Sequence, residues 1–425
     1  NSNPFCRFCY FSSTNRKLFK MKKLTLTLLI LFISCQSDNK DEFKNKVISE
    51  IKKTDIPAVV MGKIYKSGKM DFYSYGSSRW GRTDLINEKN IFRIASMTKA
   101  LSSVAALQLV ECGKITLDES LDEYLPEMSK IPILNENNDV VNPINSITLR
   151  HLLTHTSGFG TWFTSSKLKN WDSLKNTIGW KVKGEPRLFE AGSSFMYGKS
   201  TYWIGKLIEK ISEMSLEDYF REHITGPLQM NSTWFNVPDD LENLVSSSFK
   251  RNKKTNKLTP KKYAKKKRTK SYNAAAGLSS SPEDYGKFIS CMLNGGSINN
   301  LRILKRETFE LLNEPQLKSF RQIHRYVPDA NVDVDPRGDK DFFFDNFDNW
   351  TLAWGYEENS IVRPIGTAYW AGFNNTYFTI DFENEFGLVY MTQITPFNDM
   401  SSFNLFTSFE RLIYDEIKNN KESTW

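Results

Sequence analysis

Strand-forming residues lie at the two ends of this chain, and this separation constrains the fold more than any other feature. Residues 56–65 and 70–77 flank a Gly-bearing turn and predict a β-hairpin. Near the other end, residues 367–373, 376–382 and 386–394 are aromatic and β-branched. Helical patterns fill the stretch between. We therefore predict an α+β fold with one antiparallel β-sheet, flanked by helices and completed from both ends of the chain.

The middle of the chain predicts a mostly helical insertion over about residues 120–270. With the sheet, it would make one domain over 44–420. One predicted helix begins at Ser96 and stops at Gly113, since glycine is a common helix C-terminal signal. Another begins at Ser281-Pro282, residue types suited to the first helical positions. The other predicted helices cover 41–53, 201–211, 216–224 and 401–418.

The first 34 residues predict a targeting segment. We interpret residues 1–20 as upstream sequence that is not part of the protein itself. Met21 then begins a short basic stretch. Residues 24–33 are apolar, but a bilayer-spanning helix needs about 20 residues. The following Ser34-Cys35 resembles a bacterial lipoprotein processing site, which predicts lipidation at Cys35 and a polar tether over 35–43. The chain would then be exported and held on a membrane, facing the periplasm or the exterior. An ordinary cleaved signal peptide is the alternative.

The net charge of +8 comes from two local clusters. Residues 1–34 hold six basic residues and no acid, so removing them leaves +2. The run from Lys250 to Lys270 holds twelve Lys or Arg and no acid, and removing it as well leaves −10. Charge confined to a short run argues against a nucleic-acid-binding fold. We interpret this run as a solvated β-ribbon or loop, with contact to anionic lipid headgroups or surface polymers as the alternative.

Cysteine and histidine usage predicts neither a metal site nor a cofactor. The chain has four histidines. Cys6 and Cys9 have zinc-like spacing, but no second pair follows them. Cys112 and Cys291 fall in apolar helical patterns, where a buried free thiol is the commoner outcome. If the chain is exported, a disulfide between these two cysteines is the alternative.

Ser96 and Lys99 form the first chemical signal. On the first turn of a helix, residues i and i+3 lie on one face, about 5–6 Å apart at Cβ. The serine N–H there is a free donor at the positive end of the helix dipole. A lysine in a dry pocket has a lowered pKa and can accept the serine proton. The four-residue pattern by itself is weak, because it recurs by chance.

The surrounding sequence gives the pattern its meaning. It resembles the family of class C β-lactamases, D-alanyl-D-alanine carboxypeptidases and esterases, and the resemblance covers about residues 44–415. The segments that carry it follow the family's order: Phe92 to Lys99, Leu107 to Asp118, Tyr124 to Glu127, Thr148 to Phe159, Ala191 to Tyr197 and Ala276 to Tyr285.

The resemblance implies a role for each matching position. Ser96 would be the acylated nucleophile and Lys99 its proton partner. Tyr197 would relay protons between Ser96 and the leaving group. The third motif falls on Trp370-Ala371-Gly372, whose small residues let a substrate approach the strand. The N–H groups of Ser96 and Phe373 would form the oxyanion hole.

Two departures from the family bear on the substrate. The lactamase and carboxypeptidase members have Tyr-x-Asn, whereas this chain has Tyr197-Gly198-Lys199. They also have Lys-Thr-Gly on the third strand, where the lysine holds a substrate carboxylate. Trp370 occupies that position here, and a neutral ring cannot make a charge-assisted bond. Lys199 could restore the cation from the opposite wall of the cleft. The simpler interpretation is a surface lysine, or one paired with Glu190.

Two other serine patterns are set aside. His155 and Ser157 resemble parts of a catalytic triad, but they fall in a stretch that matches a structural turn of the family. A hydrolase elbow with the pattern Gly-x-Ser-x-Gly is absent, since the segment that begins at Gly76 ends in Trp80.

The sequence therefore predicts a serine hydrolase that forms an acyl-enzyme on Ser96 and acts on small carboxylic esters. A β-lactamase or D-alanyl-D-alanine carboxypeptidase, acting on β-lactams or peptide-like amides, is the first alternative. A protein that binds or senses cell-wall peptides with little turnover is the second.

Overall fold

The computed structural model describes residues 41–252, 254–317, 349–358 and 360–422 of the 425-residue chain. The leader, Cys35 and most of the tether lie outside the described residues. Export and lipidation therefore stay predictions.

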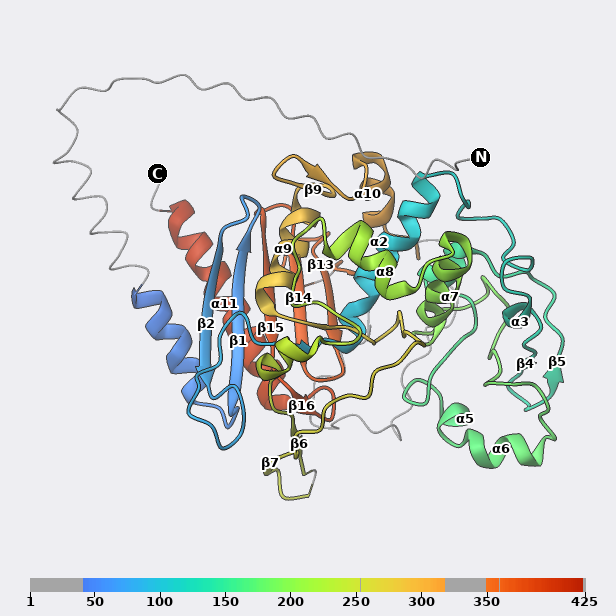
Figure 1. Ribbon diagram of the computed structural model, residues 1–425, viewed down its shortest axis with the longest axis horizontal. Coiled ribbons are helices and arrows are strands. Elements are labelled where there is room, and N and C mark those ends of the chain that lie inside the picture. Colours follow the sequence, from blue (N-terminus) through green and yellow to red (C-terminus); the bar gives the residue numbers. More distant parts are fainter. Residues whose placement is uncertain (1–40, 253, 318–348, 359, 423–425) are drawn as a thin grey trace.

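A seven-stranded antiparallel sheet forms the centre of the molecule (Figure 1). Its strand order is β11-β12-β13-β14-β15-β1-β2. The N-terminal hairpin pairs directly with the C-terminal strands, since Val60 of β1 lies opposite Met391 of β15. The predicted fold class is confirmed. β11 and β12, two residues each, were not predicted. The sheet strands are β1 (Ala58–Tyr65), β2 (Met70–Gly76), β11 (Asn349–Trp350), β12 (Gly355–Tyr356), β13 (Ala368–Gly372), β14 (Thr376–Asp381) and β15 (Phe386–Met391).

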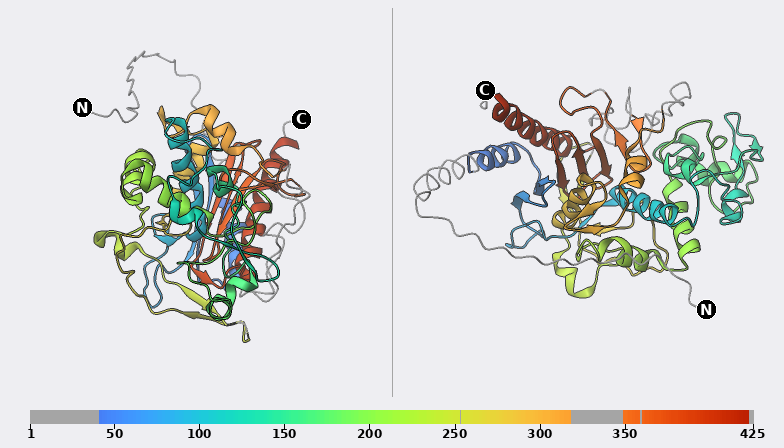
Figure 2. Two further views of the ribbon diagram at one scale, coloured as in Figure 1. Left: turned by 90° about the vertical axis from the view of Figure 1, so that its right-hand side faces the viewer. Right: turned by 90° about the horizontal axis from the view of Figure 1, so that it is seen from above.

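Helices cover both faces of this sheet (Figure 2). Successive side chains of a strand point to opposite faces. In β14, Tyr377 accordingly stacks on Phe406 of α11 (Met400–Glu422), with ring centroids 4.9 Å apart. Its neighbour Phe378 meets Tyr285 of α9 (Pro282–Leu293) at 5.4 Å on the other face. The N-cap of α9 is Ser281, as predicted, and its side chain accepts from the N–H of Asp284.

Helix α2 (Thr98–Glu111) lies between the sheet and the helical part of the molecule. Its first twelve residues are all buried, which is typical of a helix enclosed on every side. It packs against α7 (Ser200–Ser212). The other helices of the described chain are one over 41–52, α3 (Pro126–Ser129), α4 (Leu149–Leu153), α5 (Ser166–Lys169), α6 (Trp171–Thr177), α8 (Leu216–Phe220) and α10 (Arg306–Asn313).

Part of the basic run forms a short β-ribbon, in agreement with the simpler interpretation. β6 (Phe249–Arg251) pairs with β7 (Leu258–Pro260) and lies parallel to β16 (Ile394–Thr395). The remaining short pairs are β3 (Phe92–Arg93) with β8 (Ser279–Ser280), β4 (Ile133–Leu134) with β5 (Val140–Val141), and β9 (Ser297–Ile298) with β10 (Leu301–Arg302).

Among the described residues, no disulfide joins Cys112 and Cys291, so the possible bond between them does not form. Among the helices of the described ranges, none combines the length and the apolar character needed to cross a bilayer.

Candidate active site

Ser96 lies on the 3₁₀ turn Ala95–Met97, which leads directly into α2. The turn is held from two sides: Thr98 Oγ1 donates to the Ala95 carbonyl at 2.6 Å, and the Tyr285 hydroxyl donates to the Met97 carbonyl at 3.1 Å. Ala95 has a φ of +43°, a region that costs an L-residue about 1 kcal/mol or more. The buried contacts around the turn thus hold Ser96 at a strained bend.

Lys99 is buried directly behind Ser96. Its Nζ donates to Ser96 Oγ at 3.3 Å and to the carbonyl of Ala275 at 2.9 Å. Only 4% of the residue is exposed, and burial lowers the pKa of Lys99 to about 7. Near neutral pH a large fraction of this lysine is therefore uncharged and able to accept a proton.

Tyr197 completes the group from the segment before α7. Its ring lies 4.6 Å from Lys99 Nζ, and the Ser96 side chain is close enough to its hydroxyl to lower the pKa of that group slightly. Trp370 Nε1 donates to the same hydroxyl at 3.1 Å. Since an indole N–H can only donate, the phenol oxygen accepts from Trp370 and keeps its own proton for another partner. Burial raises the pKa of Tyr197 above its usual value, so the phenol stays protonated at neutral pH.

These residues open onto one cavity of about 340 Å³. Its walls are mainly aromatic. No Lys or Arg is among the described residues that line it. The lining consists of Ala95, Ser96, Trp162, Phe163, Tyr197, Ala276, Trp370, Ala371, Gly372, Phe373, Asn374 and Phe397.

The end of β13 runs close against the Ser96 turn. A Cβ added at Gly372 would overlap the carbonyl oxygen of Ile94, so only glycine permits this approach. In the described chain, neither the N–H of Ser96 nor that of Phe373 donates to another backbone carbonyl. Two free N–H groups at the wall of one cavity are what an oxyanion hole requires.

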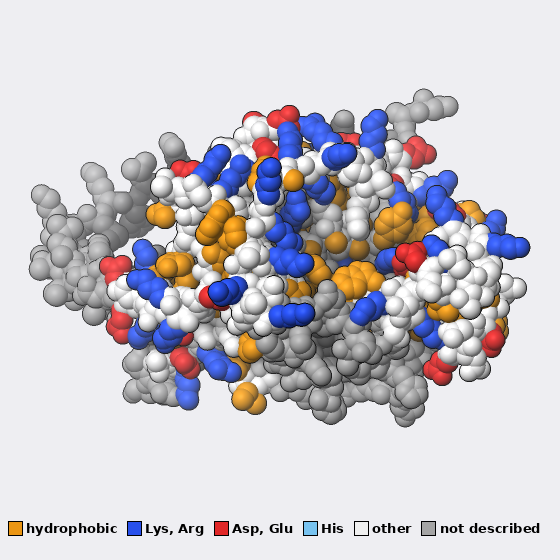
Figure 3. Space-filling view, turned by 90° about the horizontal axis from the view of Figure 1, so that it is seen from below, with side chains coloured by type: hydrophobic (Ala, Val, Ile, Leu, Met, Phe, Trp, Pro, Cys, Tyr) orange, Lys and Arg blue, Asp and Glu red, His pale blue; other side chains and the backbone are white. Residues whose placement is uncertain are grey.

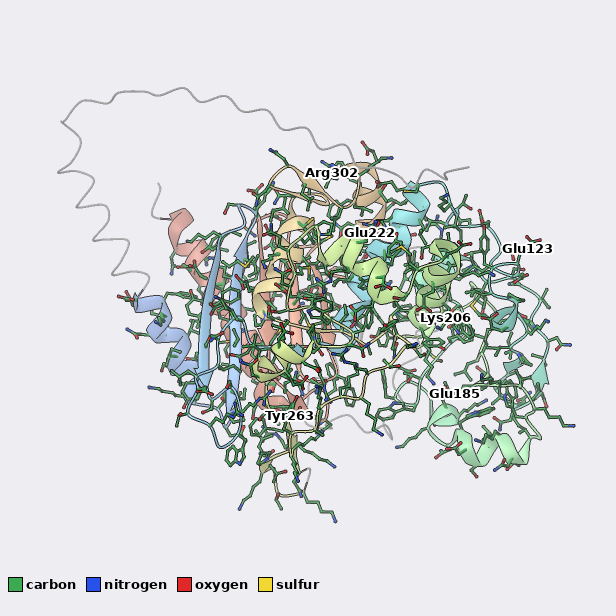
Figure 4. All side chains as sticks on the ribbon, in the orientation of Figure 1. Glu123, Glu185, Lys206, Glu222, Tyr263 and Arg302 are labelled. Carbon is green, nitrogen blue, oxygen red and sulfur yellow. The ribbon has the colours of Figure 1, made fainter. Side chains whose placement is uncertain are left out.

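Lys199 is not at this cavity, and the hypothesis that it replaces the missing cation is not supported. Its Nζ pairs with Glu185 at 2.6 Å, and nearly half of its side chain is exposed. The predicted partner Glu190 instead accepts from the backbone N–H groups of Ile144 and Asn145. Figure 4 places Glu185 in the helical part, away from the sheet.

His155 and Ser157 are buried parts of the turn, in agreement with the structural role assigned to them. The His155 ring packs on Tyr197, with centroids 4.7 Å apart, and on Trp350 at 5.1 Å. Burial, and then the nearby charge of Lys99, hold the pKa of His155 well below its usual value. The Ser157 hydroxyl bonds with that of Ser200 at 2.8 Å.

The structure thus brings together every predicted site residue of the described chain except Lys199. Trp162, Phe163, Asn374 and Phe397 were not predicted. None has a local signal, because a lone aromatic residue in a loop is commonly a core residue. Within the described ranges, no three His, Cys, Asp or Glu side chains are grouped as a metal site requires.

Comparison with known proteins agrees with this fold. The family model described as Beta-lactamase matches residues 43–405. A mutant of simvastatin synthase (LovD) from Aspergillus terreus superposes with a TM-score of 0.75 at 24% identity, covering 87% of this chain and 93% of that one.

Two curated relatives have names that describe acyl chemistry. Monacolin J acid methylbutanoyltransferase from Aspergillus terreus is 26% identical over 86% of this chain and 93% of its own length. Lovastatin esterase from Penicillium rubens is 28% identical over 38% of this chain and 45% of its own length.

Proposed function

Because the chain belongs to the beta-lactamase family, we propose that it cleaves small, neutral carboxylic esters through an acyl-enzyme on Ser96. The family and fold make it a serine hydrolase or acyltransferase of the β-lactamase type. The observation that carries the finer proposal is the placement of Ser96, Lys99 and Tyr197 at an aromatic cavity without a lining cation.

The proposed reaction assigns a role to each of these residues. Neutral Lys99 accepts the proton of Ser96, whose Oγ attacks the ester carbonyl carbon. The carbonyl oxygen becomes negative and accepts from the N–H groups of Ser96 and Phe373. As the C–O bond of the ester breaks, Tyr197 protonates the leaving alkoxide and is reprotonated from Lys99. Water then attacks the acyl-enzyme as neutral Lys99 accepts its proton, and Lys99 returns that proton to Ser96 Oγ as the acid leaves.

Neutral substrates follow from the composition of the cavity wall. The alternative substrates, β-lactams and D-alanyl-D-alanine peptides, carry a carboxylate, which binds most strongly to a positively charged side chain. Trp370 occupies the predicted cation position, and its N–H is already engaged with Tyr197. The aromatic side chains instead favour burial of an apolar acyl group.

Transfer of the acyl group to an alcohol is the second candidate. The methylbutanoyltransferase relative supports it by name, and an aromatic cavity favours an organic acceptor over water. In this case an added alcohol would accelerate release of the first product and appear as a new ester. Its concentration dependence would separate transfer from hydrolysis.

The test compares the full chain with Ser96→Ala on p-nitrophenyl butyrate and on a chromogenic cephalosporin. We expect ester turnover with little cephalosporin hydrolysis, and a loss of roughly 10⁴-fold or more in kcat/KM in Ser96→Ala. Ser157→Ala is the matched control, because Ser157 is buried against Ser200 and should leave turnover within a few-fold of the parent.

The other outcomes are equally informative. Turnover of the cephalosporin at a rate comparable to that of the ester would favour the β-lactamase alternative. Equal activity in the parent and Ser96→Ala would remove the nucleophile assignment. Stoichiometric acylation of Ser96 without turnover would favour the binding or sensing alternative.

A further inference from the structure

Residues 249–270, here called the basic ribbon, carry an unbalanced positive charge. Lys265 and Arg268 pair with Asp239, but eight other lysines of the ribbon are exposed, and no ion pair forms on any of them in the described part of the chain. These eight are Lys250, Lys254, Lys257, Lys261, Lys262, Lys266, Lys267 and Lys270.

Some of these charges lie close enough to repel one another. Burial first, and then the charges of Lys250 and Arg93, lower the pKa of Lys261. Arg93 is exposed and lies three residues before Ser96. An excess of cations on one surface is stabilised by an external anion.

The ribbon is fixed to the body of the protein. Arg251 of β6 is buried, and its guanidinium pairs with Asp399, which is also buried. The same guanidinium donates to Asp55 at 2.9 Å. Lys250, Lys254 and Lys257 are therefore displayed from the pinned β6–β7 hairpin, which projects from the lower end of the molecule in Figure 1, and the other lysines follow in the segment after β7.

Exposed apolar side chains lie beside β6 and in the loop that contacts it. Trp80 is 65% exposed, and its ring meets Phe249 of β6 with centroids 6.1 Å apart. Leu85, in the same loop as Trp80, is 76% exposed. Tyr263, labelled near β6 and β7 in Figure 4, is partly exposed and lies 4.4 Å from the guanidinium of Arg79.

Trp and Tyr beside lysines are typical of surfaces that lie at a lipid headgroup layer. A soluble polyanion needs the charges but not an exposed tryptophan. We propose that the basic ribbon, together with Trp80 and Leu85, docks on an anionic phospholipid surface. The docking depends neither on the proposed reaction nor on a lipid at Cys35.

The candidate active site opens beside this surface. Lys261 Nζ donates to Thr395 Oγ1 at 3.0 Å, and Phe397, two residues later, lines the cavity. Figure 3 looks onto this end of the molecule and shows a band of Lys and Arg next to a hollow that exposes hydrophobic side chains. Docking would therefore bring the mouth of the cavity close to the lipid.

The test is co-sedimentation of the full chain with vesicles of phosphatidylcholine, with and without 30% phosphatidylglycerol. The ribbon variant changes Lys254, Lys257, Lys261, Lys262 and Lys267 to Gln. Since each lysine near an anionic surface adds to binding, we expect the partition constant on the anionic vesicles to fall by at least about 100-fold. Binding of the parent should also weaken in high salt.

A matched control removes the same charge elsewhere. Lys44, Lys52, Lys130, Lys210 and Lys305 are exposed on other elements, and changing all five to Gln should leave binding within a few-fold of the parent. Both variants should hydrolyse a soluble p-nitrophenyl ester like the parent, which verifies their folding. Trp80→Ala should weaken vesicle binding but not binding to heparin.

Equal loss of binding in the two lysine variants would overturn the proposal, as would binding that ignores salt and phosphatidylglycerol. Heparin binding as tight as vesicle binding, with no effect of Trp80→Ala on either, would assign the surface to a soluble polyanion instead.

Discussion

Lys99 is the residue whose ionisation should control the rate. Burial brings its pKa to about 7, and only the neutral form accepts the Ser96 proton. Below that pH the lysine is protonated, so kcat/KM for a neutral ester should fall about tenfold per pH unit, and above it the rate should level off. A pH–rate profile of kcat/KM between pH 5 and 9 measures this limb.

Neighbouring groups do not offer another origin for this limb. The pKa of His155 is held well below its usual value, and that of Tyr197 is raised above its own. Lys99→Arg is the control, because a guanidinium stays charged across this range and should remove activity at every pH. A rate that stays flat down to pH 5 would contradict the assignment of Lys99 as the base.

At the scale of elements, the contact between β13 and the Ser96 turn should set the oxyanion hole. In Gly372→Ala the new methyl group would overlap the Ile94 carbonyl and push the strand away. Displacing one N–H donor typically costs about 10²–10³ in kcat, and we expect a loss of that size together with a lower melting temperature. Steady-state kinetics and thermal unfolding of the same preparations measure both.

Gly387→Ala separates the effect on the site from the effect on stability. Gly387 lies in the same sheet, where an added methyl group would meet Ile289 of α9 instead of the Ser96 turn. This variant should lose stability but keep kcat per folded molecule. If both variants lose kcat equally, the close approach of Gly372 is not what positions the donors.

At the scale of the whole molecule, one buried guanidinium joins three distant parts of the chain. Arg251 of the ribbon holds Asp55, after the first helix, and Asp399, before α11. Arg251→Ala would leave Asp399 buried without its partner, which typically costs about 3–5 kcal/mol. Urea unfolding of the parent and the variant measures the change in the free energy of unfolding.

The exposed pair between Lys66 and Glu385 provides the comparison. Both side chains are more than a third exposed, so Lys66→Ala should cost no more than about 1 kcal/mol. Losses of similar size in the two variants would show that burial does not give the Arg251 pair its larger role.

Features that depend on neighbours along the chain could be predicted from the amino-acid sequence. The strands β13, β14 and β15, the N-cap of α9 and the spacing of Ser96 and Lys99 follow from local periodicity and residue type. The resemblance to a known family added Tyr197, Trp370 and Phe373, each of which the structure places at the cavity. β11 and β12 were not predicted, because a two-residue strand is too short to show the alternation of apolar and polar residues that marks a strand.

Features that depend on long-range packing could not be predicted in this way. The pKa of Lys99 is set by burial under segments far along the chain, such as Ala275. The aromatic wall joins Trp162 to Phe397, which local patterns cannot bring together. Lys199 follows Tyr197 by two residues, yet its side chain turns away to Glu185. Spacing along a chain fixes which residues are neighbours, whereas long-range packing fixes which surfaces they share and how dry those surfaces are.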